Sequence, residues 1–415
     1  MQRFRDILFK HKYAICFFVF NLFYQFVIAG NCKLWAVRDA TYSHHAVDFS
    51  VGFCSKLLTG AISNWLFHPI TRIKVTVQET VMILLVFAVV SLLLERLMIA
   101  AKQDVKTTLF LFIFLFLTGT YTFSVYTQAL GLMDAYWLYL TLLIIVLLTN
   151  KYLYLMIPFA AAGVVMIHYA AVICFVPFIA ILLIYKTTLC KTKKEHSLLK
   201  IVTILTVSIG VLLSGYFALF ERDNVKITME EFDAMMHNRG VTDTAYFDEV
   251  YFSYYDRTFV IDDPDAADQP SSQKDDPFIL IVWKRLLATF IEVKAKGVPW
   301  KVIASVTLIA PVLYYIEKSI FRLLKATKDK TKRFVFFCSM FLPFVVPLAG
   351  LMVSTDQIRW LSHGYLLFFS MFMIFVYYEK RLQEILIGMK VTSIPAPILI
   401  SYFIIYASTV FHPYT

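Results

Sequence analysis

The chain has 415 residues, of which 59% are hydrophobic and 16% are charged, and its formal net charge is +10. Soluble globular domains carry about 25% charged residues, so this composition excludes an ordinary soluble protein. Apolar runs of about 18 residues or more recur along the chain, and each can cross the hydrocarbon layer of a bilayer as a helix. The sequence therefore predicts an all-α, polytopic membrane protein with a single transmembrane domain.

We expect about eleven spanning helices, with the N-terminus in the cytoplasm. In that orientation the basic clusters KTKKEH (191–196) and KATKDKTKR (325–333) both lie on the cytoplasmic side, which is the positive-inside pattern. The net positive charge then marks the membrane face that meets anionic lipid, and it requires no nucleic-acid partner. The expected spans lie near residues 13–30, 80–99, 107–127, 135–149, 152–167, 169–186, 199–220, 300–317, 334–353, 364–378 and 391–411.

The first outer loop, residues 31–79, is much longer than a connection between two helices needs. Its apolar stretch, residues 49–67, could lie on the membrane surface, and the loop also carries Asp39 and Asp48. A carboxylate close to lipid is unfavourable unless it is paired, bound to a metal or used in catalysis. We therefore predict Asp48 as a general base toward a sugar hydroxyl or as a metal ligand, with Asp39 as a second catalytic candidate. The alternative for Asp48 is a helix cap, because it directly precedes FSVGFCSKLL.

Other candidates accompany these aspartates. Arg38 and His45 are substrate-binding candidates in the first loop. His44 and His45 cannot both face one ligand, because adjacent residues diverge around a helix, and the alternative for both is a surface histidine. Asp134 lies between two later spans on the same side and could supply a second carboxylate to a divalent metal, Mg²⁺ or Mn²⁺, shared with Asp48. The alternative for Asp134 is an ordinary interfacial acid.

Two candidates come later in the chain. His168 lies between two short spans on the outer side, as a substrate-binding residue or as a structural histidine. The turn DQIRWLSH contains Asp356 and Arg359, which are three residues apart and could pair on one face of a helix. An arginine at the membrane rim suits bidentate binding of phosphate, so we predict that Arg359 binds the phosphate of a substrate, with Asp356 beside it. The alternative is an ordinary interfacial pair, with Trp360 as the membrane anchor.

The second outer segment, residues 221–301, opens with the acidic amphipathic stretch KITMEEFDAMMHNRG, which predicts a surface helix. It continues into DDPDAADQPSSQKDDP, which is typical of a mobile loop. The chain contains no GxGxxG or P-loop sequence and no CxxC pair, so we expect neither direct nucleotide coupling nor a zinc or redox motif. Cys32 and Cys54 share the first loop and could form a disulfide, or they are two small apolar residues.

These features together resemble the GT-C class of membrane glycosyltransferases: a long acidic first loop with Asp39 and Asp48, a second outer segment after the seventh span, and the arginine-bearing turn DQIRW. The stretch HAVDFSVGFCSKLLTG is also similar to membrane proteins of bacterial surface-polysaccharide clusters. The resemblance implies that a first-loop aspartate is the catalytic base or a metal ligand. It implies a sugar donor carried on polyprenyl phosphate or pyrophosphate, and basic residues that bind this phosphate. It further implies a glycan or lipid-linked acceptor, and a bacterial inner membrane with the active site facing outward.

Other functions remain open. A polymerase that joins lipid-linked repeat units would depend on arginines more than on a first-loop aspartate. A flippase or transporter for a lipid-linked oligosaccharide needs charged or polar groups deep within spans. The expected spans contain few such groups besides Ser, Thr and Tyr, whereas ionisable residues gather at the outer rim. This distribution favours chemistry at the rim; an acyltransferase would need a membrane-embedded histidine, for which His168 is the candidate.

Overall fold

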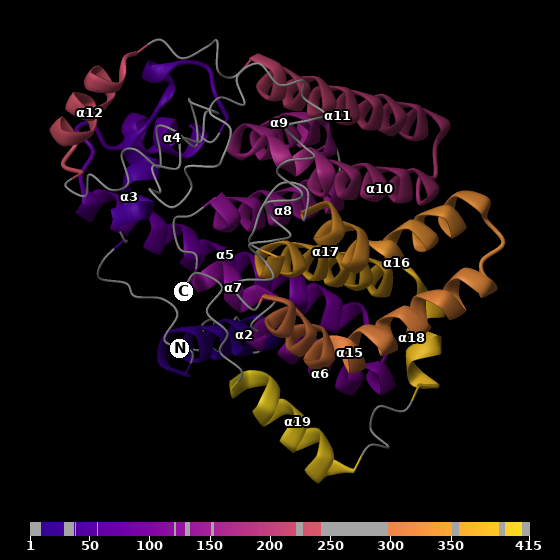
Figure 1. The fold of residues 1–415 in the computed structure, drawn as a ribbon. Coiled ribbons are helices and arrows are strands. Elements are labelled where there is room, and N and C mark those ends of the chain that lie inside the picture. Colours follow the sequence, from indigo (N-terminus) through magenta and orange to yellow (C-terminus); the bar gives the residue numbers. More distant parts are fainter. Residues whose placement is uncertain are drawn as a thin grey trace.

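The computed structural model describes residues 10–28, 37, 39–55, 57–119, 122–128, 133–150, 153–220, 227–241, 298–350, 357–389 and 395–408. Every regular element in these residues is a helix, as the sequence predicts (Figure 1). The helices are α2 (Lys12–Phe23), η1 (Tyr24–Ile28), α3 (Asp39–Ala46), η2 (Phe49–Val51), α4 (Leu58–Leu66), α5 (Arg72–Ala100), α6 (Gln103–Thr118), α7 (Phe123–Gln128), α8 (Met133–Thr149), η3 (Leu153–Met156), α9 (Ile157–Ile167), η4 (Tyr169–Ile173), α10 (Phe175–Thr188), α11 (Lys193–Phe220), α12 (Met229–Asn238), α15 (Val298–Ala326), α16 (Lys330–Gly350), α17 (Gln357–Tyr378), α18 (Lys380–Ile387) and α19 (Ala396–Ser408).

Four helices in the described part of the chain, α5, α11, α16 and α17, are long and apolar enough to cross a membrane. A helix satisfies its backbone N–H and C=O groups internally, which is what a hydrocarbon environment demands of an apolar run. A helix also lies within each of the other predicted spans, and several of these are shorter apolar helices of 10–17 residues. The four long helices agree with the membrane protein expected from composition, while eleven spans and their orientation stay predictions.

The bundle has two ends, which carry different segments of the chain (Figure 1). One end, which we call the basic end, contains helix α18 and the connections at residues 189–192 and 327–329. Lys332 Nζ donates to Glu379 Oε1 there at 2.6 Å, which ties the start of α16 to the end of α17. The opposite end, which we call the loop end, carries α3, α4 and α12.

The loop end has an apolar core of its own, separate from the core of the bundle. Val47, Val51 and Cys54 of the first loop pack there with Phe232 and Met236 of α12. Helix α12 begins with a capping box, in which the side chains and backbone N–H groups of its first turn bond reciprocally. The predicted surface helix is therefore confirmed, and it docks onto the first loop. The predicted mobile loop lies outside the described residues, as does Cys32.

Helix α4 lies directly against the segment that follows α3. A Cβ atom placed on Gly60 would come within 1.6 Å of the backbone oxygen of Val47 and 3.1 Å of that of His44. Real Cβ atoms essentially never approach other atoms below 3.0 Å, so only glycine permits this approach. This close contact lets helix α4 pack over the C-terminal end of α3 and bury the side chains between the two helices.

Candidate active site at the loop end

Helix α5 carries an acidic residue, Glu79, whose side chain is fully buried at the loop end. The hydroxyl of Tyr136, on α8, donates to Glu79 Oε1 at 2.5 Å, and Gln78 Nε2 donates to that hydroxyl at 3.0 Å. His45 Nε2 of the first loop lies 3.8 Å from the same carboxylate oxygen. A buried carboxylate requires such partners, because its desolvation is otherwise uncompensated. The network therefore joins the first loop, α5 and α8.

The His45 side chain is linked to helix α4. Ser63 Oγ donates to the backbone oxygen of Thr59 at 3.0 Å, and His45 Nδ1 lies 2.7 Å from Ser63 Oγ. Ser63 Oγ therefore joins the His45 ring to the backbone of α4. His45 Nε2 faces Glu79 on the other side of the ring, 3.8 Å from Oε1.

The surface position considered for His45 is wrong, because its side chain is fully buried while that of His44 is half-buried. Helix α4 causes this burial by packing over α3. Asn64 of α4 donates its Nδ2 to the backbone oxygen of His45 at 3.3 Å, which fixes the two helices together. Of the two adjacent histidines, His45 alone reaches Glu79 among the described contacts.

Asp48 is the N-cap of the 3₁₀ turn η2, the structural alternative considered for it. Its Oδ1 accepts from the backbone N–H of Ser50 at 2.9 Å, and its Oδ2 lies 3.2 Å from Arg239 Nη2. Arg239 follows α12 and also donates to the backbone oxygen of Ala46. Both carboxylate oxygens are thus bound to protein groups, and a catalytic role of Asp48 stays a prediction.

The backbone of Arg239 makes a second connection to the first loop, because its oxygen accepts a hydrogen bond from the Tyr42 hydroxyl. Burial raises the pKa of Tyr42 above its ordinary value, while the charges of Arg239 and Arg72 oppose this rise. The hydroxyl therefore stays protonated and continues to donate. Helix α12 is held to α3 by this bond and by the Arg239 guanidinium.

Aromatic rings around Trp137, the residue after Tyr136, bring three separate parts of the chain together. The ring centroid of Trp137 lies 5.0 Å from that of His363, 5.8 Å from that of His168 and 6.1 Å from that of Trp360. His363 Nδ1 is 2.7 Å from the hydroxyl of Tyr126. His168 and the turn that begins α17 are therefore neighbours.

His168 also has a local structural role, which was the alternative considered for it. Its Nδ1 accepts from the backbone N–H of Ala170 at 3.1 Å and caps the 3₁₀ turn η4. This bond leaves Nε2 as the nitrogen that carries the proton in the neutral ring.

The remaining candidate site residues are only partly described by the structure. Arg359 lies in the first turn of α17 and is half-buried. Asp39 begins α3 and Asp134 is the second residue of α8, so both belong to the loop end, but their side chains lie outside the described residues. Arg38 and Asp356 also lie outside them, so the Asp356–Arg359 pair stays a prediction.

The implied metal has no complete ligand set among the described residues, which contain no group of three or more His, Cys, Asp or Glu side chains placed for one. Asp48 contacts the guanidinium of Arg239, with which a cation would have to compete. The side chains that could complete a set with it, Asp39 and Asp134, are not among those described. We therefore assign no step to a metal ion.

Sequence reasoning missed Glu79, Tyr136, Ser63 and His363. A signal for Glu79 was present, because it is an acidic residue at the entrance of a long apolar run and such a group needs partners. Tyr136 had no signal of its own, since tyrosine is common at membrane interfaces. The pairing of Glu79 with His45 depends on the close packing of α4, which the local sequence pattern does not reveal.

No protein-family model, curated protein or solved structure matches this chain. Its function must therefore be inferred from its own residues and contacts.

Proposed function

We propose that this chain is a glycosyltransferase of the GT-C type, which transfers a sugar from a polyprenyl phosphate or pyrophosphate carrier to an acceptor hydroxyl. The reaction takes place at the loop end, which faces the outer side of the membrane, in a bacterial inner membrane. The acceptor is a glycan or a lipid-linked glycan, and the donor enters from the bilayer.

One observation carries the proposal: polar residues from five separate segments gather at the same end of the bundle. The first loop, α5, α8, the α9–η4 junction and α17 contribute the side chains, which are joined through Tyr136 and the neighbouring Trp137. Ligand sites in helical bundles form where side chains of several helices converge in this way. Aromatic rings also suit sugar binding, because they offer large apolar faces beside polar edges.

Each of these residues has a separate role in the proposed reaction. Arg359 binds the phosphate of the donor and stabilises the negative charge of the departing carrier, since guanidinium groups match phosphate geometry. Asp39 accepts the proton of the acceptor hydroxyl as general base. Asp48 stabilises the conformation of the first loop through its cap and its contact with Arg239. The buried Glu79 network stabilises the same loop through His45.

A polysaccharide polymerase is the second candidate, and the bonding of Asp48 favours it. Both oxygens of that carboxylate are already bound, which weakens the case for a base at this position. A polymerase of this kind would depend on Arg359 and would be insensitive to neutralisation of Asp39 or Asp48.

The test compares source cells that lack the protein with the same cells carrying the wild type, Asp39→Asn or Arg359→Gln. Mass spectrometry would identify the surface glycans and the lipid-linked intermediates. We expect each variant to lower sugar transfer by at least about a hundredfold, the range for loss of a general base or of a charge-stabilising donor. Glu230→Gln, an exposed acid of α12, and Arg322→Gln, an exposed arginine of α15, are the matched controls and should leave transfer unchanged.

Each alternative has its own product. Absence of one sugar in the null cells and in both variants supports the transferase. Single repeat units in place of long chains, with loss only in Arg359→Gln, would identify a polymerase. A complete lipid-linked oligosaccharide that stays on the cytoplasmic side would identify a flippase and overturn the enzymatic function.

A further inference from the structure

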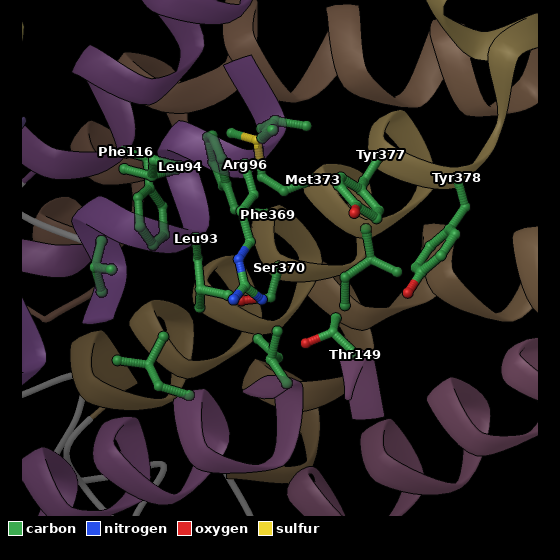
Figure 2. A pocket seen from close by; sticks show the side chains of 15 residues that line it. Leu93, Leu94, Arg96, Phe116, Thr149, Phe369, Ser370, Met373, Tyr377 and Tyr378 are labelled. Carbon is green, nitrogen blue, oxygen red and sulfur yellow. The ribbon is translucent and has the colours of Figure 1, made fainter. Parts of the chain in front are cut away.

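A cavity of about 120 Å³ lies between α5, α6, α8 and α17, away from the loop end. Its walls are mostly apolar and include Leu93, Phe116 and Met373. Arg96 is the one charged side chain among the described residues that line it, and Figure 2 shows it pointing into the cavity on the side of Ser370. An apolar chamber with a single guanidinium suits an amphiphile with one anionic group.

The charge of Arg96 is not neutralised by the protein in the part of the chain that the structure describes, where it forms no ion pair and donates no hydrogen bond. The neighbouring Glu95 is bonded to His11. Glu379, at the same end of the bundle, is bonded to Lys332. Arg96 is an exposed residue near the end of this candidate spanning helix, so its guanidinium is open to pairing with an anionic group.

A second cation adjoins the cavity at the basic end. Lys186 Nζ lies 5.5 Å from the ring centroid of Tyr378, which lines the cavity together with the exposed Tyr377. Arg96 is four residues from the end of α5, or about 6 Å along the helix axis. A residue this close to the end of a spanning helix lies near the head-group layer of one leaflet.

We propose that this cavity binds one glycerophospholipid with an anionic head group. One acyl chain lies along the apolar wall, and the phosphate pairs with Arg96. Free phosphate does not use the apolar wall, and a neutral lipid does not use the guanidinium. The site is at the opposite end of the bundle from the proposed transfer reaction and is independent of it.

The first experiment needs no variant. The whole purified protein, in neutral detergent, is mixed with a phosphatidylglycerol that carries a diazirine on its acyl chain, and the labelled residues are found by mass spectrometry. We expect label on the cavity-lining stretches of α5, α8 and α17, competed by unlabelled phosphatidylglycerol and not by a diacylglycerol with the same chains. The exposed apolar face of α11, which includes Ile204 and Leu212, is the internal control for ordinary lipid contact.

The second experiment measures phosphatidylglycerol affinity from the rise in melting temperature. Arg96→Gln should weaken binding about tenfold, as expected for loss of a charge-assisted pair. Arg322→Gln removes an exposed arginine of α15 outside the cavity and should change nothing. Leu93→Trp should fill the apolar part and reduce acyl labelling while keeping Arg96.

Three results would overturn the proposal. Label on α11 as dense as on the cavity stretches would mean ordinary lipid contact. Glycerol phosphate that competes as well as phosphatidylglycerol would mean an anion site without a lipid. Polyprenyl phosphate that displaces phosphatidylglycerol at much lower concentration would mean a site for the sugar carrier. The glycan analysis and the lipid labelling can fail separately. If the Asp39 and Arg359 variants leave glycan synthesis unchanged while the labelling pattern is as expected, the proposed transferase is wrong and the lipid site is retained.

Discussion

Helix α5 carries one buried glutamate near each end, and the two are bonded in different ways. Glu79, at the loop end, faces His45, and both side chains are 0% exposed. Glu95, at the basic end, bonds His11 at 2.8 Å, and this histidine is 40% exposed. They are 16 residues apart, since 95 − 79 = 16, which corresponds to about 24 Å along the axis.

The difference shows how burial determines the contribution of a Glu–His pair to stability. Water can reach His11 and replace a lost bond to it, so the His11–Glu95 contact is exchangeable, while Glu95 Oε1 also accepts from the backbone N–H of Ala14 at 3.2 Å. No water replaces Tyr136 or His45 around Glu79, because these partners come from other enclosed segments. We therefore expect changes at the loop end to have much larger effects than matched changes at the basic end.

The largest effect should follow from Glu79→Ala. The change leaves the Tyr136 hydroxyl and His45 Nε2 buried without their shared partner, and breaking such a pair costs about 4 kcal/mol of unfolding free energy. Unfolding in mixed micelles, followed by tryptophan fluorescence, measures this loss. Glu79→Gln, which keeps the shape and one acceptor, is the matched control and should lose less; equal stability of wild type and Glu79→Ala would refute the network.

Gly60→Ala should come next, with a loss of about 3 kcal/mol, because the new methyl group meets the backbone oxygen of Val47. The control is Gly215→Ala on α11, where nothing lies within 4 Å of the new Cβ. This control should be neutral or raise stability by about 0.5 kcal/mol, since alanine favours a helix over glycine. The same unfolding assay compares them, and a well-tolerated Gly60→Ala would contradict the close approach of α4.

These two sites also mark the limit of prediction from the sequence. The helical class, the helix that became α12 and the cap at Asp48 follow from local patterns, because apolar periodicity and capping residues act within a few positions. The burial of His45 depends on Gly60, fifteen positions away, and on a helix crossing that no local pattern specifies.

The same limit applies to the candidate site: its local features follow from the sequence, and the contacts between its parts do not. His168 and the DQIRW turn are predicted separately from the sequence; the structure shows the local structural role considered for His168, and helix α17 begins at Gln357. Their meeting around Trp137 could not be predicted, because it requires the packing of α8 against α9 and α17. Side chains of long sequence separation are brought together by tertiary packing, which leaves no local signal.

A smaller effect is expected from Arg239→Gln, which releases Asp48 and the backbone oxygen of Ala46. Loss of these charge-assisted bonds on a partly exposed residue should cost about 2 kcal/mol and make the first loop more sensitive to limited proteolysis. Asp48→Asn keeps a capping acceptor and should cost less than about 1 kcal/mol. If Asp48→Asn instead abolishes sugar transfer at wild-type stability, Asp48 acts in catalysis and not only as a cap.

The smallest effect belongs to the basic end. Glu95→Gln and His11→Ala should each change the unfolding free energy by no more than about 1 kcal/mol, because one partner is exposed and solvent screens the pair. A double-mutant cycle isolates the coupling between the two side chains, and the same cycle on Glu79 and His45 gives the matching value for the enclosed pair. We expect the enclosed coupling to be larger despite its longer distance of 3.8 Å, because the low dielectric of the interior strengthens electrostatic interactions. If the exposed pair has the larger coupling energy, contact distance matters more than burial in this bundle. The expected difference between the two ends of α5 would then be wrong.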